Sequence, residues 1–303
     1  MNKKWIAVPA GVAAAVMMNT AAVAAPITAD VVFLVDESGS MSGEHTWLGN
    51  MIASLESGLQ GQGVGVSEAN RYSLVGFGGS SYQNHLDPHP HDMDGGTGGT
   101  QAWGSSTQFA SATSSLVVTG GTEDGWNALD WAINNLNYRG NAAVNFVLVT
   151  DEDRDNTNAA VNKAGLLSGL NGLSALLNVV VNNNFGCGGS SNNAIGIDSD
   201  DNGFQADGAG GFTKCEGAGV VGSGYGTTDS DYVDLALDSG GAAWNLNILR
   251  SGGNNAASFT TSFVDTKVQE ITEQPPVSTV PEPGTLALLG LGLTGLAFRR
   301  KKA

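Results

Sequence analysis

Short apolar runs alternate along the chain with segments whose apolar residues recur at the spacing of an α-helix. Residues 31–35 are apolar throughout, and residues 144–149 are apolar at all but one position, as in strands buried on both faces. We predict strands over residues 31–35, 72–77, 144–149, 175–181 and 243–249, and helices over 47–59, 108–117, 123–136, 157–170, 229–237 and 256–271. This order predicts an α/β, doubly wound fold with a mostly parallel central sheet flanked by helices.

Two long segments interrupt the alternation, at residues 78–106 and 182–228. Both are rich in Gly, Ser and Asn and contain few large apolar residues. Loops of this length in a compact domain are usually functional or mobile, and in doubly wound folds they decorate the ends and edges of the sheet. We therefore predict two insertions that lie outside the core of one domain over residues 29–272.

The N-terminus has the features of a secretory signal peptide. Lys3 and Lys4 precede an apolar stretch over residues 5–23, and small residues around Ala24 suit a signal peptidase. We predict a signal peptide over residues 1–24, removed by signal peptidase, and an exported mature chain.

At the other end, residues 286–298 are apolar and are followed at once by four basic residues. A helix of this length rises about 20 Å, which is short of the roughly 30 Å hydrocarbon core, so the segment suits transient retention in the inner membrane better than a lasting anchor. Residues 273–280 contain two prolines and are predicted to be a linker before a tail over residues 281–303.

The chain is strongly acidic, with 13 Lys and Arg residues against 29 Asp and Glu residues. Loss of both ends would remove six basic residues and one acidic residue, which leaves a net charge near −21. Such a charge repels phosphate backbones, so nucleic acid is excluded as a partner, whereas divalent cations suit it. The two cysteines, Cys187 and Cys215, would meet an oxidising compartment after export, which favours a disulfide over a catalytic thiol.

Carboxylates and hydroxyls gather at predicted strand ends. The first strand runs into Asp36, Ser38 and Ser40, the second apolar strand ends at Asp151, and Thr122 precedes a predicted helix. Ligand sites of doubly wound folds lie at the carboxyl ends of parallel strands. Two carboxylates and three hydroxyls form an all-oxygen set, which suits Mg²⁺, or Mn²⁺ and Ca²⁺ less selectively. A ligand carboxylate could complete the coordination shell.

This order of a strand, a DxSxS motif, a GGT before a helix and an apolar strand ending in TD resembles the von Willebrand factor A (vWA) fold. The resemblance implies a metal-ion-dependent adhesion site (MIDAS). It assigns Asp36, Ser38 and Ser40 to the first positions of that motif, Thr122 to its loop threonine and Asp151 to its second aspartate.

The triplet Pro281, Glu282 and Pro283, with the apolar run and basic residues behind it, resembles the PEP-CTERM sorting signal. The resemblance implies processing by an exosortase near the triplet in a Gram-negative bacterium. It also implies delivery to the cell surface, outer envelope or extracellular matrix, such as that of a biofilm.

Two weaker candidates remain open. Asp198, Asp200 and Asn202 follow the opening of an EF-hand-like Ca²⁺ loop, but Ala209 stands where its closing glutamate belongs. The alternative is a solvated loop. The segment 85–94 carries His85, His89 and His91 among aspartates, and its two interpretations are an exposed polar loop and a transition-metal site.

The sequence thus predicts a surface or matrix adhesion protein that binds a carboxylate-bearing protein or exopolysaccharide through a divalent metal. An alternative is a structural matrix protein stiffened by Ca²⁺. A metal-dependent hydrolase would need a nucleophile with a base, or a second metal, so we predict that the protein is not an enzyme.

Overall fold

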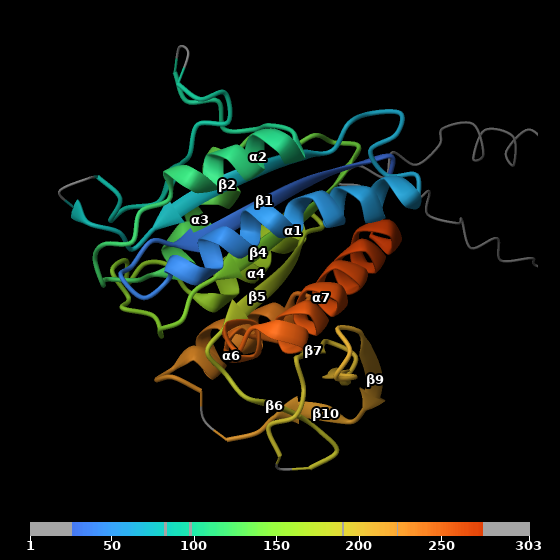
Figure 1. Ribbon diagram of the computed structural model, residues 1–303. Coiled ribbons are helices and arrows are strands. Elements are labelled where there is room, and N and C mark those ends of the chain that lie inside the picture. The colour runs from blue at the N-terminus through green and yellow to red at the C-terminus, as the bar shows by residue number, and fades with distance from the viewer. Residues whose placement is uncertain (1–25, 82–83, 97–98, 190, 223, 275–303) are drawn as a thin grey trace, which may run out of the picture.

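The computed structural model describes residues 26–81, 84–96, 99–189, 191–222 and 224–274. Its centre is a nine-stranded sheet in the order β3-β2-β1-β4-β5-β11-β7-β8-β9 (Figure 1). The parallel strands at its centre are β2 (Arg71–Phe77), β1 (Thr28–Asp36), β4 (Ala142–Val149), β5 (Leu176–Val181) and β11 (Ala242–Asn245). Antiparallel strands flank them: β3 (His89–Pro90) on one side, and β7 (Gly196–Asp198), β8 (Asn202–Ala206) and β9 (Phe212–Glu216) on the other. The predicted fold class is confirmed.

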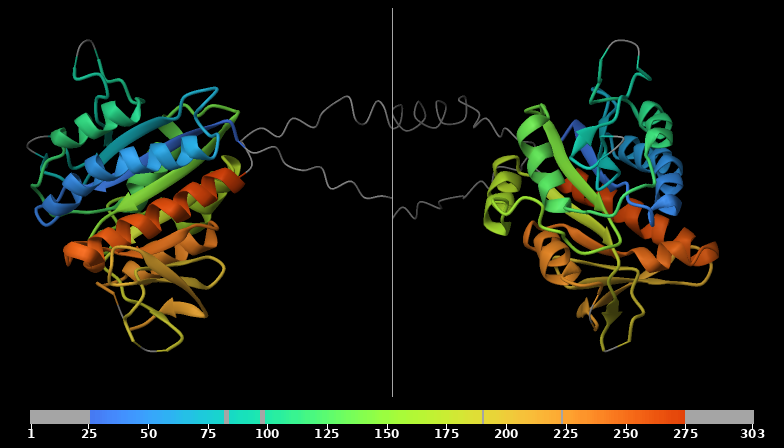
Figure 2. Two further views of the ribbon diagram at one scale, coloured as in Figure 1. Left: turned by 45° about the vertical axis from the view of Figure 1, so that its right-hand side comes forward. Right: turned by 90° about the vertical axis from the view of Figure 1, so that its left-hand side faces the viewer.

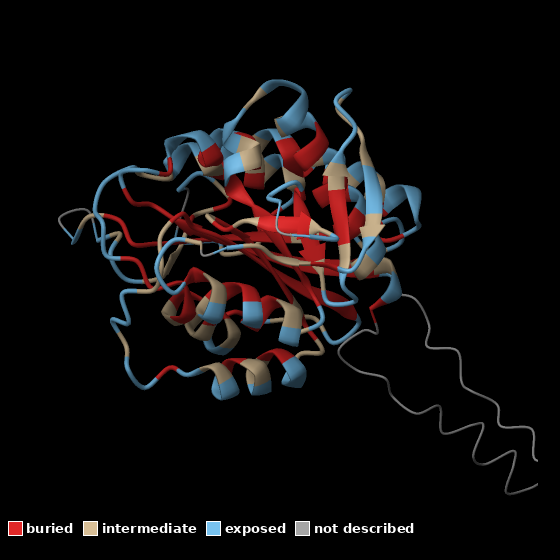
Figure 3. Cartoon of the chain, turned by 90° about the horizontal axis from the view of Figure 1, so that it is seen from below, coloured by how far each residue is buried: buried red, intermediate tan, exposed pale blue. Residues whose placement is uncertain are grey.

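Helices cover both faces of the sheet (Figure 2). The elements on one face are α1 (Ser42–Gly61), α2 (Ser106–Ala112) and α7 (Gly253–Glu273), and those on the other are α3 (Gly125–Asn135), α4 (Lys163–Gly172) and α5 (Asp234–Asp238). Alternate residues of β1 supply the two cores, with Phe33 packed on the first face and Leu34 on the second. In Figure 3 the central strands are buried almost throughout, whereas the helices are buried only where they face the sheet.

Several predicted element boundaries were wrong because polar side chains cap helices that the apolar pattern does not show. The last predicted strand ends at Asn245, whose side chain accepts the backbone N–H of Asn247 at 3.0 Å and starts α6 (Leu246–Arg250). The helix predicted from residue 157 begins only after Asn162, which caps α4 in the same way. A π-helical turn (Asp229–Val233) precedes α5, and a 3-10 turn (Thr113–Ser115) follows α2.

The prediction that the insertions lie outside the core was wrong. The second insertion adds β7, β8 and β9 to the sheet and forms a small sheet of β6 (Phe185–Cys187) and β10 (Ala218–Val220), seen at the bottom of Figure 1. Some of its large apolar residues point inward: Phe204 is fully buried and stacks on Trp244 with ring centroids 5.1 Å apart. In the first insertion Met93 is buried as well.

A disulfide joins Cys187 of β6 to Cys215 of β9, with Cα atoms 6.0 Å apart. It links the small sheet to the edge of the main sheet, within the second insertion. The bond spans 28 residues of chain, so it restricts the conformations of this Gly-rich segment.

The predicted signal peptide over residues 1–24 and the tail over residues 281–303 lie outside the described residues, as do residues 275–280 of the predicted linker. Helix α7 continues through Glu273, the first linker residue. Within the described ranges, no helix combines the length and apolar character needed to cross a bilayer.

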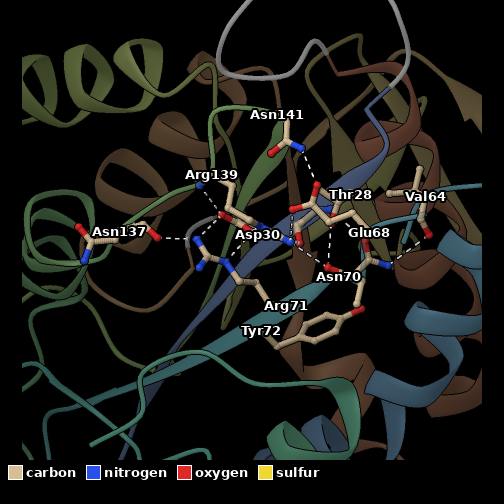
Figure 4. A network of polar contacts seen from close by, with 12 residues as sticks. Thr28, Asp30, Val64, Glu68, Asn70, Arg71, Tyr72, Asn137, Arg139 and Asn141 are labelled. Carbon is tan, nitrogen blue, oxygen red and sulfur yellow. Dashed lines mark hydrogen bonds and ion pairs between the residues drawn. The ribbon is translucent and has the colours of Figure 1, made fainter. Parts of the chain in front are cut away.

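A polar network holds the amino end of β1 (Figure 4). Asp30 is fully buried and receives hydrogen bonds from the guanidinium groups of Arg71 and Arg139, at 2.6–2.8 Å. Arg139 also reaches Glu68 at 3.0 Å. Two cations therefore surround one buried carboxylate at the end of the sheet opposite Asp36.

Candidate metal centre

Two adjacent parallel strands bring Asp36 and Asp151 together. Asp36 is the last residue of β1, and Asp151 follows β4 by two residues. Val35 of β1 is in register with Val149 of β4, so the two strands end at the same level of the sheet. Asp36 is fully buried and Asp151 is 6% exposed.

Hydroxyl and backbone donors hold these carboxylates in place. Asp36 accepts the Ser38 backbone N–H at 2.7 Å and the Thr150 hydroxyl at 2.9 Å. The Ser40 hydroxyl donates to Asp151 Oδ1 at 2.9 Å and lies 3.2 Å from the Ser38 hydroxyl. Four of the five predicted ligand residues therefore lie in one polar cluster.

The sequence analysis missed Glu123, which belongs to this cluster. Carboxylate oxygens of Asp36, Glu123 and Asp151 all lie within 4.8 Å of one another, and all three residues are buried. Glu123 Oε2 is buried, and no hydrogen-bond partner for it lies among the described residues. In the sequence, Glu123 stands directly after the GGT motif and directly before Asp124, the N-cap residue of α3. This position was the only local indication that it could take part in the site.

Thr122, the fifth predicted ligand, is exposed in the loop before α3. It lines a cavity of about 50 Å³ together with Phe77, Asp87 and Asp124. Its role as a metal ligand remains a prediction, whereas the carboxylate of the next residue lies in the cluster.

The buried environment disfavours the ionised form of the carboxyl groups in this cluster. Burial raises the pKa of Asp36 to about 7, although hydrogen bonds from Ser38 and Thr150 oppose the shift. Burial also raises the pKa of Glu123 to about 8, and the charge of Asp36 adds to this effect. A divalent cation would relieve both causes, because it replaces lost hydration and offsets the repulsion between carboxylates.

One arginine lies at the rim of the cluster. Arg250, at the end of α6, contacts Glu44 Oε1 through Nε at 2.6 Å and Asp151 Oδ2 through Nη2 at 2.9 Å. Its side chain is 31% exposed. The apolar pattern had placed the preceding residues in a strand, so this position could not be predicted.

The predicted Ca²⁺ loop forms the turn between β7 and β8. The Asp198 carboxylate accepts the backbone N–H groups of Asp200 and Asn202 at 3.0 and 2.9 Å, and it also accepts the Asn202 side-chain amide. The turn is therefore held by its own hydrogen bonds. Ca²⁺ binding there remains a prediction.

The donor atoms of the cluster determine which metal ion it favours. Three carboxylates and two serine hydroxyls supply only oxygen, which favours a hard cation such as Mg²⁺ over softer metals. The strand ends and the loop after β1 fix these donors on rigid elements. The arrangement can hold one divalent ion at the carboxyl edge of the sheet.

Comparisons with known proteins give a short match to a family model and distant matches to structures. No curated protein matches the chain. Among the solved structures that it resembles is proximal thread matrix protein 1 from the mussel byssus with a zinc-occupied MIDAS motif (TM-score 0.38, 14% identity, 53% of this chain and 37% of that one). Another is a von Willebrand factor type A protein from Catenulispora acidiphila (TM-score 0.30, 17% identity, 51% of this chain and 33% of that one). The chain thus spans about a third of the length of these structures.

Residues 279–301 match the model of the PEP-CTERM protein-sorting motif. This confirms the prediction made from the Pro281–Glu282–Pro283 triplet. The motif marks an exported protein with a sorting signal at its C-terminus. The chain therefore combines a doubly wound α/β body with a PEP-CTERM tail.

Proposed function

We propose that this exported protein is an adhesion module that binds an acidic ligand through one divalent ion, most suitably Mg²⁺, at the Asp36 edge of the sheet. The observation that carries the proposal is the buried group of Asp36, Glu123 and Asp151. Within the described residues, neither Asp36 nor Glu123 has an ion-pair partner. Buried carboxylates without cations are costly, and a bound metal ion removes that cost.

The ligand class follows from charge. The mature chain carries a net charge near −21, so a carboxylate-bearing protein or exopolysaccharide would be repelled without a bridging cation. An ion held by protein oxygens can accept one more carboxylate from outside. Arg250 at the rim would pair with the same ligand. The proposed role is binding without catalysis.

Location and processing follow from the two ends of the chain. We propose that signal peptidase removes residues 1–24 and that an exosortase processes the tail after transient retention in the inner membrane. The body would then reach the cell surface or extracellular matrix of a Gram-negative bacterium. A metal-bridged contact with matrix polymers suits such a place.

Binding of a polyuronate such as polygalacturonate tests the proposal. The exported protein should bind the polymer in Mg²⁺ and release it in EDTA, and Asp36→Asn should abolish Mg²⁺-dependent binding. Asp198→Asn is the matched control, because it removes one carboxylate of the other predicted cation loop and should leave binding unchanged. Equal binding by wild type and Asp36→Asn would refute the proposed site.

A further inference from the structure

We propose that Glu37, His85, His89 and His91 form a second metal site, which binds a zinc-class transition-metal ion. The site is separate from the oxygen-lined centre and does not depend on the proposed adhesion function. Ligand atoms of all four residues lie within 4.8 Å of one another. Three of the four histidines in the chain therefore converge on one carboxylate.

Residues of the first insertion and the residue that follows β1 build the cluster. Glu37 follows β1 directly, and its backbone N–H donates to the Phe77 carbonyl at 2.8 Å. His85 lies in the loop after β2, His89 lies in β3, and His91 follows β3. The side chain of Glu37 is fully buried, and that of His91 is 4% exposed.

The imidazole rings of His89 and His91 have the orientation that is common among metal-bound histidines. His89 Nδ1 lies 2.8 Å from the Asp87 carbonyl oxygen, and His91 Nδ1 lies 2.6 Å from the Ser115 hydroxyl. These outer contacts leave Nε2 of each ring directed at Glu37. Among the described residues, neither Nε2 atom has a hydrogen bond of regular geometry, although both are buried and face the Glu37 carboxylate. An outer acceptor that fixes the tautomer while the other nitrogen faces inward is the common second-shell arrangement of metal sites.

Two imidazole–carboxylate distances, one to each oxygen of Glu37, match the separation of two donors on a tetrahedral ion. His89 Nε2 lies 3.2 Å from Glu37 Oε2, and His91 Nε2 lies 3.3 Å from Glu37 Oε1. Donors about 2.0 Å from a tetrahedral Zn²⁺ lie about 3.3 Å apart. His85 Nδ1 is nearer, at 2.7 Å from Glu37 Oε2, so a modest opening of this pair would admit the ion.

Gly76 of β2 keeps the space for this cluster. A Cβ atom at this position would lie 2.7 Å from His91 Nε2 and would also overlap the Glu37 carboxylate. A side chain there is therefore excluded by the same atoms that would bind the metal. The close approach of strand β2 and the ligand group is consistent with a built site.

The donor chemistry separates the two sites. Imidazole nitrogens favour zinc and neighbouring transition metals, whereas the Asp36 centre offers only oxygen. Consecutive residues, Asp36 and Glu37, would each supply a ligand to a different ion. Four protein donors leave no open position on a tetrahedral ion, so the second ion would have a structural role. It would fasten the first insertion to the carboxyl edge beside the adhesion site.

Zinc titration of the chelator-treated full-length exported protein tests this inference. Excess Mg²⁺ is kept present to occupy the oxygen centre, and binding is followed by competition with a zinc indicator. We expect one Zn²⁺ per chain, and Co²⁺ should give the visible absorption of a tetrahedral site. His85→Ala and His89→Ala should weaken Zn²⁺ binding by more than about 100-fold, since loss of a second-shell partner alone costs about 10- to 100-fold.

Controls separate this site from folding effects and from the adhesion centre. His45→Gln alters the remaining histidine and should keep the Zn²⁺ affinity, as should Asp36→Asn. Ser115→Ala removes only the outer partner of His91 and should weaken binding about tenfold or more. Circular dichroism establishes that each variant is folded. Absence of Zn²⁺ binding by the wild type, or full binding by folded His89→Ala, would overturn the inference.

Discussion

Strand β1 buries an aspartate at each end, Asp30 near its start and Asp36 as its last residue. Asp30 is enclosed by the guanidinium groups of Arg71 and Arg139. Asp36 instead has two other carboxylates within reach, those of Glu123 and Asp151. A buried charge needs a partner of opposite sign, so the amino end carries its cations in the sequence. At the carboxyl end Arg250 pairs with Asp151, but among the described residues no cation pairs with Asp36 or Glu123. These two carboxylates require a cation from solution, and this difference separates a structural carboxylate from a binding one.

The largest expected effect is at the amino end. Asp30→Asn should destabilise the protein by about 3–5 kcal/mol with or without Mg²⁺, because it leaves two arginines around an uncharged amide. Chemical denaturation in Mg²⁺ and in EDTA measures this loss. Glu68→Gln is the control, since its exposed ion pair with Arg139 should contribute about 1 kcal/mol or less. If the loss of stability in Asp30→Asn depended on Mg²⁺, the proposed difference between the two ends of β1 would be contradicted.

Asp36→Asn should behave in the opposite way. Without metal it should leave the free energy of unfolding unchanged or raise it, because it removes charge from a crowded site. Mg²⁺ at about 100 times its Kd should stabilise the wild type by about 2.7 kcal/mol and the variant very little. Thermal melting with Mg²⁺ and with EDTA measures both quantities. A strong loss of stability in EDTA would show that Asp36 is structural, like Asp30.

The metal-free protein should lose stability as the pH rises. Folding raises the pKa of Asp36 from 3.8 to about 7 and that of Glu123 from 4.5 to about 8. Their stabilising contribution is therefore present at low pH and is lost as the pH rises through the folded values. We expect a decrease of at least about 1 kcal/mol between pH 5 and pH 8 in EDTA, because one pKa unit corresponds to about 1.4 kcal/mol.

Saturating Mg²⁺ should remove most of this decrease, since it binds the ionised carboxylates. The double variant Asp36→Asn with Glu123→Gln should show a weaker pH dependence in EDTA. Denaturation at several pH values is measured for the wild type in EDTA, the wild type in Mg²⁺ and the double variant in EDTA. An equal decrease in stability with rising pH in the wild type and in the double variant would show that other groups cause the pH dependence.

The smallest expected effect concerns Arg250. Arg250→Gln should weaken polyuronate binding about fivefold, as expected for an exposed charge contact of about 1 kcal/mol. Mg²⁺ affinity should stay the same or rise, because the change frees Asp151 Oδ2. Lys163→Gln is the control, since its exposed pair with Asp238 lies elsewhere. Loss of Mg²⁺ binding in Arg250→Gln would show that the arginine supports the site rather than the ligand.

Strand ends were predictable, but the residues that approach them from other elements were not. Asp36 and Asp151 each close an apolar run, so a parallel sheet must bring them to one edge. Glu123 enters the cluster through the orientation of a loop before α3, which no periodicity encodes. Arg250 was missed because the Asn245 cap converts the end of a predicted strand into a helix.

The insertions illustrate the same limit. Their Gly-rich composition predicted exclusion from the core, yet Phe204 packs against Trp244 once β8 joins the sheet. The three histidines were visible in the sequence, but Glu37, which they contact, lies far away along the chain. A cluster built across such a separation follows from tertiary packing, which a local pattern does not contain.

Calorimetric titration of Mg²⁺ into the metal-free exported protein tests the central claim most directly. The account predicts one ion per chain, with protons released on binding near neutral pH because Asp36 and Glu123 must ionise. It also predicts that the heat of binding disappears in Asp36→Asn and persists in Asp198→Asn. Full binding by Asp36→Asn, or no binding by the wild type, would contradict it.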